Sequence, residues 1–252
     1  MTRRRNSREP FFVGWAVMPG RLALFLWGLL PLVAGIVVGA ALALAIDDVT
    51  PARTTVEGGV MLTGVVALDP YPMLRLPPDA EHPAPRTVLV VQGGKNGARP
   101  RLEAHDGSLV TVHGLLYRRD GALLFELAGG EDAVMPAEAP AFAPAAAQPL
   151  GRHALAGEIV DPKCYLGAMR PGEGKPHMMC GNRCLIGGIP PMLAVHGTDG
   201  RLAMVLLVDA AGGAVTAPFE PWTSLPVRVE GEMFALDDLL VMRVGAGRVM
   251  GL

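Results

Sequence analysis

Residues 110–127 read VTVHGLLYRRDGALLFEL, and residues 227–244 read VRVEGEMFALDDLLVMRV. The two segments align without a gap: Gly114 matches Gly231, Asp120 matches Asp237, and the apolar positions coincide. Alternating apolar residues on both sides of an Asp-Gly or Asp-Asp pair are typical of two short strands joined by a tight turn. We therefore expect each segment to form a β-hairpin and the chain to contain two related copies of one unit.

The similarity extends upstream of each hairpin. Residues 62–70 read LTGVVALDP and residues 155–162 read LAGEIVDP, so each is a predicted strand that ends at Asp-Pro. Middle strands are predicted at residues 87–92 and 202–208. Gly64 lies 50 residues before Gly114, whereas Gly157 lies 74 residues before Gly231, so the second copy has about 24 extra residues. We expect these residues to form an insertion after the second Asp-Pro.

Short strands with glycine-centred turns predict a mainly β chain. Each copy suits a small, partly open barrel of about five strands, as in the OB-fold, and a pair of small β-sandwich modules is the alternative. We place the first OB-like domain, which has no cysteine, at residues 55–130 and an Ala/Pro-rich linker at residues 131–152. The second OB-like domain then spans residues 153–252, with a short helical insertion at residues 161–191.

The insertion holds every cysteine of the chain, together with a histidine: Cys164, His177, Cys180 and Cys184. A helix from about His177 to Ile186 would place His177, Cys180 and Cys184 at positions i, i+3 and i+7, on one face. A preceding loop would supply Cys164. We therefore expect these four side chains to form one site, and the first copy to be a scaffold without a site.

The second copy resembles a family of uncharacterised exported bacterial proteins. The shared motif is G-x-[IV]-x-D-x-x-C, followed by a histidine and by C-x-x-x-C. Here residues 157–164 carry its first part, and His177, Cys180 and Cys184 carry the rest. The resemblance covers residues 155–244. It implies an OB-like domain in which the four side chains are grouped, and it implies no particular reaction.

The spacing of these residues favours metal binding. Three thiolates and an imidazole match the Cys3His ligand set of zinc. Thiolates also suit Cu(I), and Met169, Met178 and Met179 place thioethers beside the set, with Met178 and Met179 as the candidate ligands. These methionines place copper ahead of zinc. One alternative is a structural disulfide between Cys164 and either Cys180 or Cys184. Thiol redox chemistry is a further alternative, although a redox pair is usually C-x-x-C in a βαβ setting. An iron-sulfur cluster is disfavoured by the apparent export of the site.

A membrane anchor precedes the β-domains. Residues 22–46 include no charged side chain, and their length as a helix exceeds the roughly 30 Å hydrocarbon core. Arginines in residues 1–21 predict a cytoplasmic N-terminus, so residues after the span are expected in the periplasm of a bacterial inner-membrane protein. The alternative is a cleaved signal peptide with a small-x-small site at Ala43-Leu44-Ala45. The long apolar run favours an uncleaved, single-pass anchor.

Charge and composition restrict the classes of function that this chain can have. The formal net charge of −2, and the absence of a basic cluster beyond the N-terminal arginines, argue against nucleic-acid binding. No catalytic residue is predicted, because we find no Ser/His/Asp order and no supported carboxylate pair. We expect a periplasmic copper- or zinc-binding accessory or assembly protein, or a small subunit of a membrane redox complex, with a protein partner. The competing class is a non-catalytic interaction scaffold with a structural disulfide.

Overall fold

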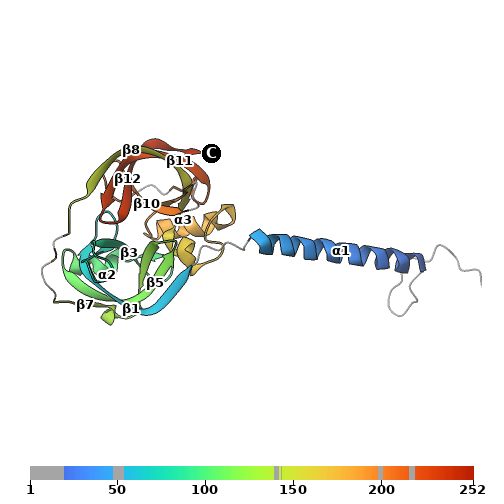
Figure 1. Ribbon diagram of the computed structural model, residues 1–252, viewed down its shortest axis with the longest axis horizontal. Helices are drawn as coiled ribbons and strands as arrows, with labels where there is room; N and C mark the ends of the chain where they lie inside the picture. The colour runs from blue at the N-terminus through green and yellow to red at the C-terminus, as the bar shows by residue number, and fades with distance from the viewer. Residues whose placement is uncertain (1–19, 48–53, 139–141, 143, 198–200, 216–218) are drawn as a thin grey trace, which may run out of the picture. The chain divides into compact units, whose positions relative to one another are not determined.

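The computed structural model describes residues 20–47, 54–138, 142, 144–197, 201–215 and 219–252 (Figure 1). The chain divides into two compact units, residues 1–51 and residues 52–252. The arginine-rich start of the predicted cytoplasmic segment lies outside the described residues.

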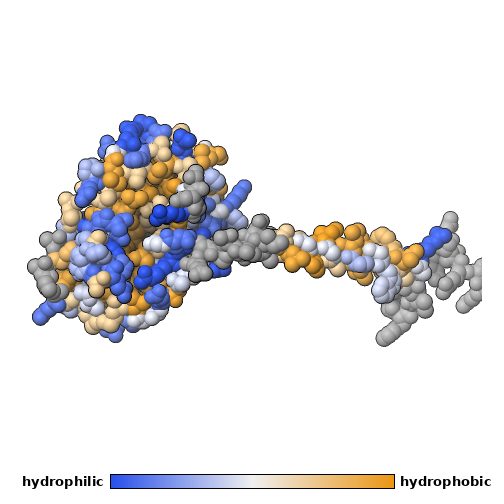
Figure 2. Space-filling model, viewed as in Figure 1, coloured by the Kyte–Doolittle hydropathy of each residue, from blue (hydrophilic) through white to orange (hydrophobic). Residues whose placement is uncertain are grey.

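The described residues of the first unit form one helix, α1 (Gly20–Asp47). Its stretch Gly20–Ala43 is long and apolar enough to cross a membrane. Apolar side chains point outward on all sides; Leu24 and Trp27 expose 77% and 79% of their surface. Figure 2 shows apolar residues along most of this helix. Pro31 lies inside it, a position that membrane helices tolerate. The predicted span, residues 22–46, falls within α1.

Two closed five-stranded barrels make up the second unit. Barrel one has the strand order β1-β2-β3-β6-β5, and β1 closes the ring by pairing with β5. Short strands β4 and β7 pair with β3 and β5. The strands are β1 (Thr55–Ala67), β2 (Met73–Leu76), β3 (Arg86–Gln92), β4 (Asn96–Gly97), β5 (Leu109–Arg119), β6 (Ala122–Leu127) and β7 (Val134–Pro136). Three short helices accompany them: α2 (Arg99–Leu102), η1 (Glu103–His105) and η2 (Glu131–Ala133).

Barrel two closes in the order β10-β12-β11-β8-β9. Its strands are β8 (Gln148–Val160), β9 (Met192–His196), β10 (Leu202–Asp209), β11 (Pro226–Leu236) and β12 (Leu239–Gly251). The third strand pairs in parallel with the fifth in each barrel, as β3 with β6 and β10 with β12. The two barrels therefore have the same strand order and directions. The middle strands predicted at residues 87–92 and 202–208 are present as β3 and β10, whereas the short strands β2 and β9 had no clear sequence signal.

The aligned sequence segments occupy equivalent positions in the two barrels. Residues 110–127 lie in β5 and β6, and residues 227–244 lie in β11 and β12. Asp120 and Asp237 stand at the hairpin tips with positive φ, 50° and 55°, which aspartate tolerates better than most residues. A Cβ atom on Gly114 or on Gly231 would overlap a carbonyl oxygen of the next strand. These positions therefore require a residue with no side chain.

The connections between the first two strands differ. Residues 68–72 join β1 to β2, whereas residues 161–191 join β8 to β9. The long connection contains a one-turn π-helix η3 (Cys164–Ala168), a short helix η4 (Lys175–His177) and the helix α3 (Met178–Ile186). The helix predicted from about His177 to Ile186 corresponds to α3. The segment predicted as a linker, residues 131–152, contains η2, β7 and the start of β8.

The barrels share an apolar interface within the second unit. Barrel one and barrel two each have a core of their own. A third cluster joins residues such as Tyr71 and Leu89 of barrel one to Tyr165 and Met192 of the second half. Burial of apolar surface contributes roughly 25 cal/mol per Å², so this cluster stabilises the contact between the barrels. The connection that carries the cysteines lies within this interface.

A buried ion pair fixes the same interface. The guanidinium of Arg75 on β2 donates from Nη2 to Oδ1 of Asp237 at 2.8 Å. Thr87 donates its hydroxyl to the other carboxylate oxygen of Asp237 at 2.8 Å. The two charged side chains expose only 8% and 2% of their surface. The tip of the second hairpin is therefore tied to barrel one.

Candidate metal centre

Asp161 begins the segment that carries the site. It follows β8 directly and is fully buried. Its Oδ1 accepts a hydrogen bond from the backbone N–H of Cys164 at 2.9 Å, which closes the turn that starts η3. Its Oδ2 lies 2.9 Å from Nε2 of His177, immediately before α3. One carboxylate thus positions both the loop cysteine and the start of the helix.

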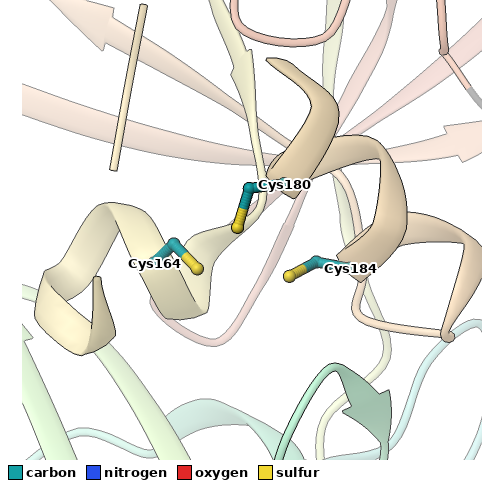
Figure 3. Close-up of side chains that lie close together, drawn as sticks. All are labelled: Cys164, Cys180 and Cys184. Carbon is teal, nitrogen blue, oxygen red and sulfur yellow. The ribbon is translucent and has the colours of Figure 1, made fainter. Parts of the chain in front are cut away.

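Three cysteine sulfurs converge between these two elements. Cys164 comes from η3, and Cys180 and Cys184 lie one turn apart on the same face of α3. All three Sγ atoms lie within 4.8 Å of one another. Figure 3 shows the three side chains pointing toward a common point. Cys164 and Cys184 are buried and Cys180 is partly exposed.

The cysteines are free thiols. The disulfide that the sequence left open, between Cys164 and Cys180 or Cys184, is not formed in the structure, because the sulfurs are not at bonding distance. Three thiol groups therefore remain for ligation or reaction.

His177 belongs to a neighbouring group and not to the all-sulfur set. A second set of candidate ligands consists of Asp161, Cys164 and His177, whose ligand atoms also lie within 4.8 Å of one another. The hydrogen bond with Asp161 raises the pKa of His177, and burial opposes it. The four residues expected to form one Cys3His site are therefore arranged as two overlapping triads that share Cys164. His177 faces Asp161, a residue expected only to end a strand and here a member of the second triad.

Lys95 reaches the cysteines from barrel one. Its Nζ lies 2.6 Å from Sγ of Cys180 and 3.7 Å from Sγ of Cys184. The hydrogen bond to Cys180 is the main cause of the raised pKa of Lys95. The first copy, expected to be a scaffold without a site, therefore places a charged side chain beside the cysteines of the second copy. The glycine-rich stretch around Lys95 signals a turn between strands, but no local pattern indicates which part of the fold the turn approaches.

Lys163 holds the turn that carries Lys95. Its buried ammonium donates to the carbonyl oxygens of Gln92 at 3.0 Å and Gly94 at 2.7 Å. It also forms an ion pair with Glu126 at 3.1 Å. Each barrel thus contributes one lysine to the contact. Lys163 of the site segment binds the turn, and Lys95 of the turn binds the cysteines.

The thiols differ in proton affinity. The hydrogen bond between Cys164 and Cys184, followed by burial, raises the pKa of Cys164. The same hydrogen bond is the largest cause of a lowered pKa at Cys184, and the nearby ammonium of Lys95 lowers it further against the effect of burial. Of the two thiols, Cys184 is therefore the one that loses its proton more readily. The thiolate is the form that binds metals and reacts as a nucleophile.

A methionine thioether completes the surroundings. The Sδ atom of Met169 lies 3.3 Å from Sγ of Cys180. Met179 exposes 81% of its surface, and Met178 is partly buried. Of the three methionines expected beside the site, Met169, which directly follows η3, is therefore the one that contacts Cys180. The described residues therefore present three thiols and one thioether, with an ammonium beside them.

Comparisons with protein-family models, with curated proteins and with solved structures find no match for this chain. The chemistry of the site is therefore the basis for its interpretation.

Proposed function

We propose that this protein is a membrane-anchored accessory protein that binds Cu(I) through Cys164, Cys180 and Cys184, with Met169 as an additional ligand. The observation that carries the proposal is the convergence of three free thiols whose sulfur atoms lie within 4.8 Å of one another. Free thiols placed so closely on two elements can ligate a single ion with little rearrangement.

The choice of copper follows from the ligand type. Soft thiolate and thioether ligands select Cu(I), and the group that converges here is composed of sulfur. Zinc would favour the Cys3His set, but Nε2 of His177 is already hydrogen bonded to Asp161. Because thiols must lose protons to bind a metal, we expect affinity to fall as the pH is lowered.

The fold proposal is that both barrels are OB-like tandem copies, and that residues 161–191 are a site-bearing insertion in the second. The shared strand order and the parallel third and fifth strands support it.

We further propose that α1 anchors the protein in a bacterial inner membrane with its N-terminus in the cytoplasm and the barrels in the periplasm. The apolar length of α1 and the N-terminal arginines support this orientation.

An accessory role suits a partly exposed site. Cys180 and Met169 are accessible from solvent, so a bound ion can pass to a protein partner by exchange of ligands. We propose that the partner is a membrane or periplasmic protein that receives the metal, such as a subunit of a redox complex.

The test is metal binding by the full-length protein in detergent. The protein is reduced, freed of metal and titrated without oxygen with Cu(I) against a competing chelator, and in parallel with Zn(II). We expect a single tightly bound copper ion. The double variant Cys180→Ser/Cys184→Ser should lose it, and Met169→Leu should weaken it. Met179→Leu is the matched control, because its side chain is exposed, and should bind copper as the wild type does.

Three results would overturn the proposal. Unchanged copper binding in the double cysteine variant would place the metal elsewhere. Tight zinc binding that is lost in His177→Gln, with weak copper binding, would assign the site to zinc. If no metal binds and one free thiol is counted after purification without reductant, the disulfide-stapled scaffold is the better account.

A further inference from the structure

The contact between Lys95 and Cys180 is unusually close. Their Nζ and Sγ atoms are 2.6 Å apart. This separation is below the range of about 2.7–3.2 Å for N–H···O hydrogen bonds, although sulfur is larger than oxygen. The two residues are 85 positions apart in sequence and belong to different barrels.

The turn that carries Lys95 is fixed by contacts with the segment that carries the cysteines. The turn of Lys95 is clamped by the ammonium of Lys163 through two carbonyl oxygens. The same turn is tied to the end of α3, because the N–H of Gly97 donates to the carbonyl oxygen of Gly187 at 2.9 Å. A Cβ atom on Gly187 would overlap the carbonyl oxygen of Lys95. The close approach of Nζ and Sγ is therefore built into the interface.

We propose that Lys95 and Cys180 form an oxidative modification site, in which molecular oxygen links Nζ to Sγ through one bridging oxygen atom. The amine and the thiol of the two side chains together carry three protons. Two of them leave with the second oxygen atom as water, and the third stays on nitrogen in the N–O–S product. Nitrogen and sulfur each lose two electrons, and dioxygen gains four, so one dioxygen molecule balances the step.

The surroundings select Cys180 for this reaction. Cys184 is farther from Nζ, at 3.7 Å, and exposes only 1% of its surface, while Cys164 exposes 4%. Cys180 is partly exposed, so an oxidant can reach it. The other cysteine sulfurs are not at bonding distance from it, which leaves the amine as the nearest partner.

The cross-link would have two consequences. It would join the two barrels covalently, and it would remove Cys180 from the sulfur set. The second consequence rests on the proposed copper binding: oxidised protein should bind copper weakly, and copper-loaded protein should resist cross-linking. The cross-link itself does not depend on the metal.

Accurate mass measurement tests the proposal directly. Metal-free full-length protein is exposed to air and compared with a sample kept without oxygen. We expect a gain of about 14 Da, one oxygen atom gained and two hydrogen atoms lost, which accurate mass distinguishes from a methyl group. Digestion should yield a linked pair of peptides containing Lys95 and Cys180. Dithiothreitol should remove the added mass and release the two peptides.

Three variants separate this site from the metal centre. Lys95→Arg and Cys180→Ser should each abolish the added mass. Cys184→Ser should keep the cross-link while it loses copper binding, so failure of one proposal does not imply failure of the other. The absence of the linked peptides in air-exposed wild type would overturn the proposal, and so would an equal mass gain in Lys95→Arg.

Discussion

Asp161 and His177 form a buried pair at the base of the site, with Oδ2 and Nε2 separated by 2.9 Å and side-chain exposures of 0% and 1%. The second carboxylate oxygen of Asp161 receives the N–H of Cys164. Because one side chain fixes the loop and the entrance to α3, it determines where Cys164 lies relative to the two helical cysteines. Asp161 is thus a positioning residue for the whole cluster.

Replacement of Asp161 by asparagine should therefore destabilise the site. The amide keeps its size but loses the charge that pairs with His177, and we expect a loss of about 1–3 kcal/mol in the free energy of unfolding. Asp69 is the matched control, because it occupies the corresponding Asp-Pro position of barrel one and its side chain is 89% exposed. Asp69→Asn should cost less than about 1 kcal/mol. Denaturant unfolding followed by circular dichroism compares the two variants. Equal losses of unfolding free energy would contradict the positioning role of Asp161.

Replacement of Arg75 by alanine tests the interface between the barrels. It leaves the carboxylate of Asp237 buried and unpaired, which typically costs about 3–5 kcal/mol. Arg99→Ala removes an exposed ion pair with Asp69 and should cost less than about 1 kcal/mol. The midpoints of thermal unfolding measure the difference. A shift for Arg75→Ala no larger than that for Arg99→Ala would show that the buried pair contributes little.

The same ion pair predicts loss of stability in acid. Burial raises the pKa of Asp237, but hydrogen bonds from Arg75 and Thr87 outweigh it, so the pKa is lower in the folded state. The resulting stability is present above the unfolded pKa of about 3.9 and is lost as the pH falls through the folded pKa. Unfolding should therefore become easier below about pH 4. In Arg75→Ala the free energy of unfolding should fall less steeply with pH in this range. If its dependence on pH is unchanged, groups other than Asp237 cause the loss of stability in acid.

Replacement of Lys95 by methionine should raise the pKa of Cys184. The variant removes the nearby ammonium but keeps the hydrogen bond from Cys164, which is the larger cause of the lowered value, so the rise should be partial. The rate of alkylation of Cys184, followed by mass spectrometry across a pH series, reports the change. Lys175→Met is the matched control, because this exposed lysine lies outside the cluster. If the alkylation rate of Cys184 depends on pH in Lys95→Met as it does in Lys175→Met, Lys95 does not lower the pKa of Cys184.

Several features could be read from the sequence because they depend on neighbouring residues. Alternating apolar residues around Asp120 and Asp237 predicted both hairpins, and their matched glycines predicted equivalent geometry. The uninterrupted apolar stretch predicted α1. The spacing of Cys180 and Cys184 predicted that they share a helix face. Short strands β2 and β9 escaped detection, since four or five residues carry too little periodic pattern.

The tertiary structure decided which side chains meet at the cysteines. It brought in Lys95, placed Met169 beside Cys180, and directed His177 toward Asp161. These contacts join residues from two barrels and from separate turns, so they depend on the packing of one barrel against the other and on the direction in which each side chain leaves its element. The sequence by itself determined that the thiols would be concentrated in one segment. Only the fold determined their partners, because contacts across an interface leave no periodic signal along the chain.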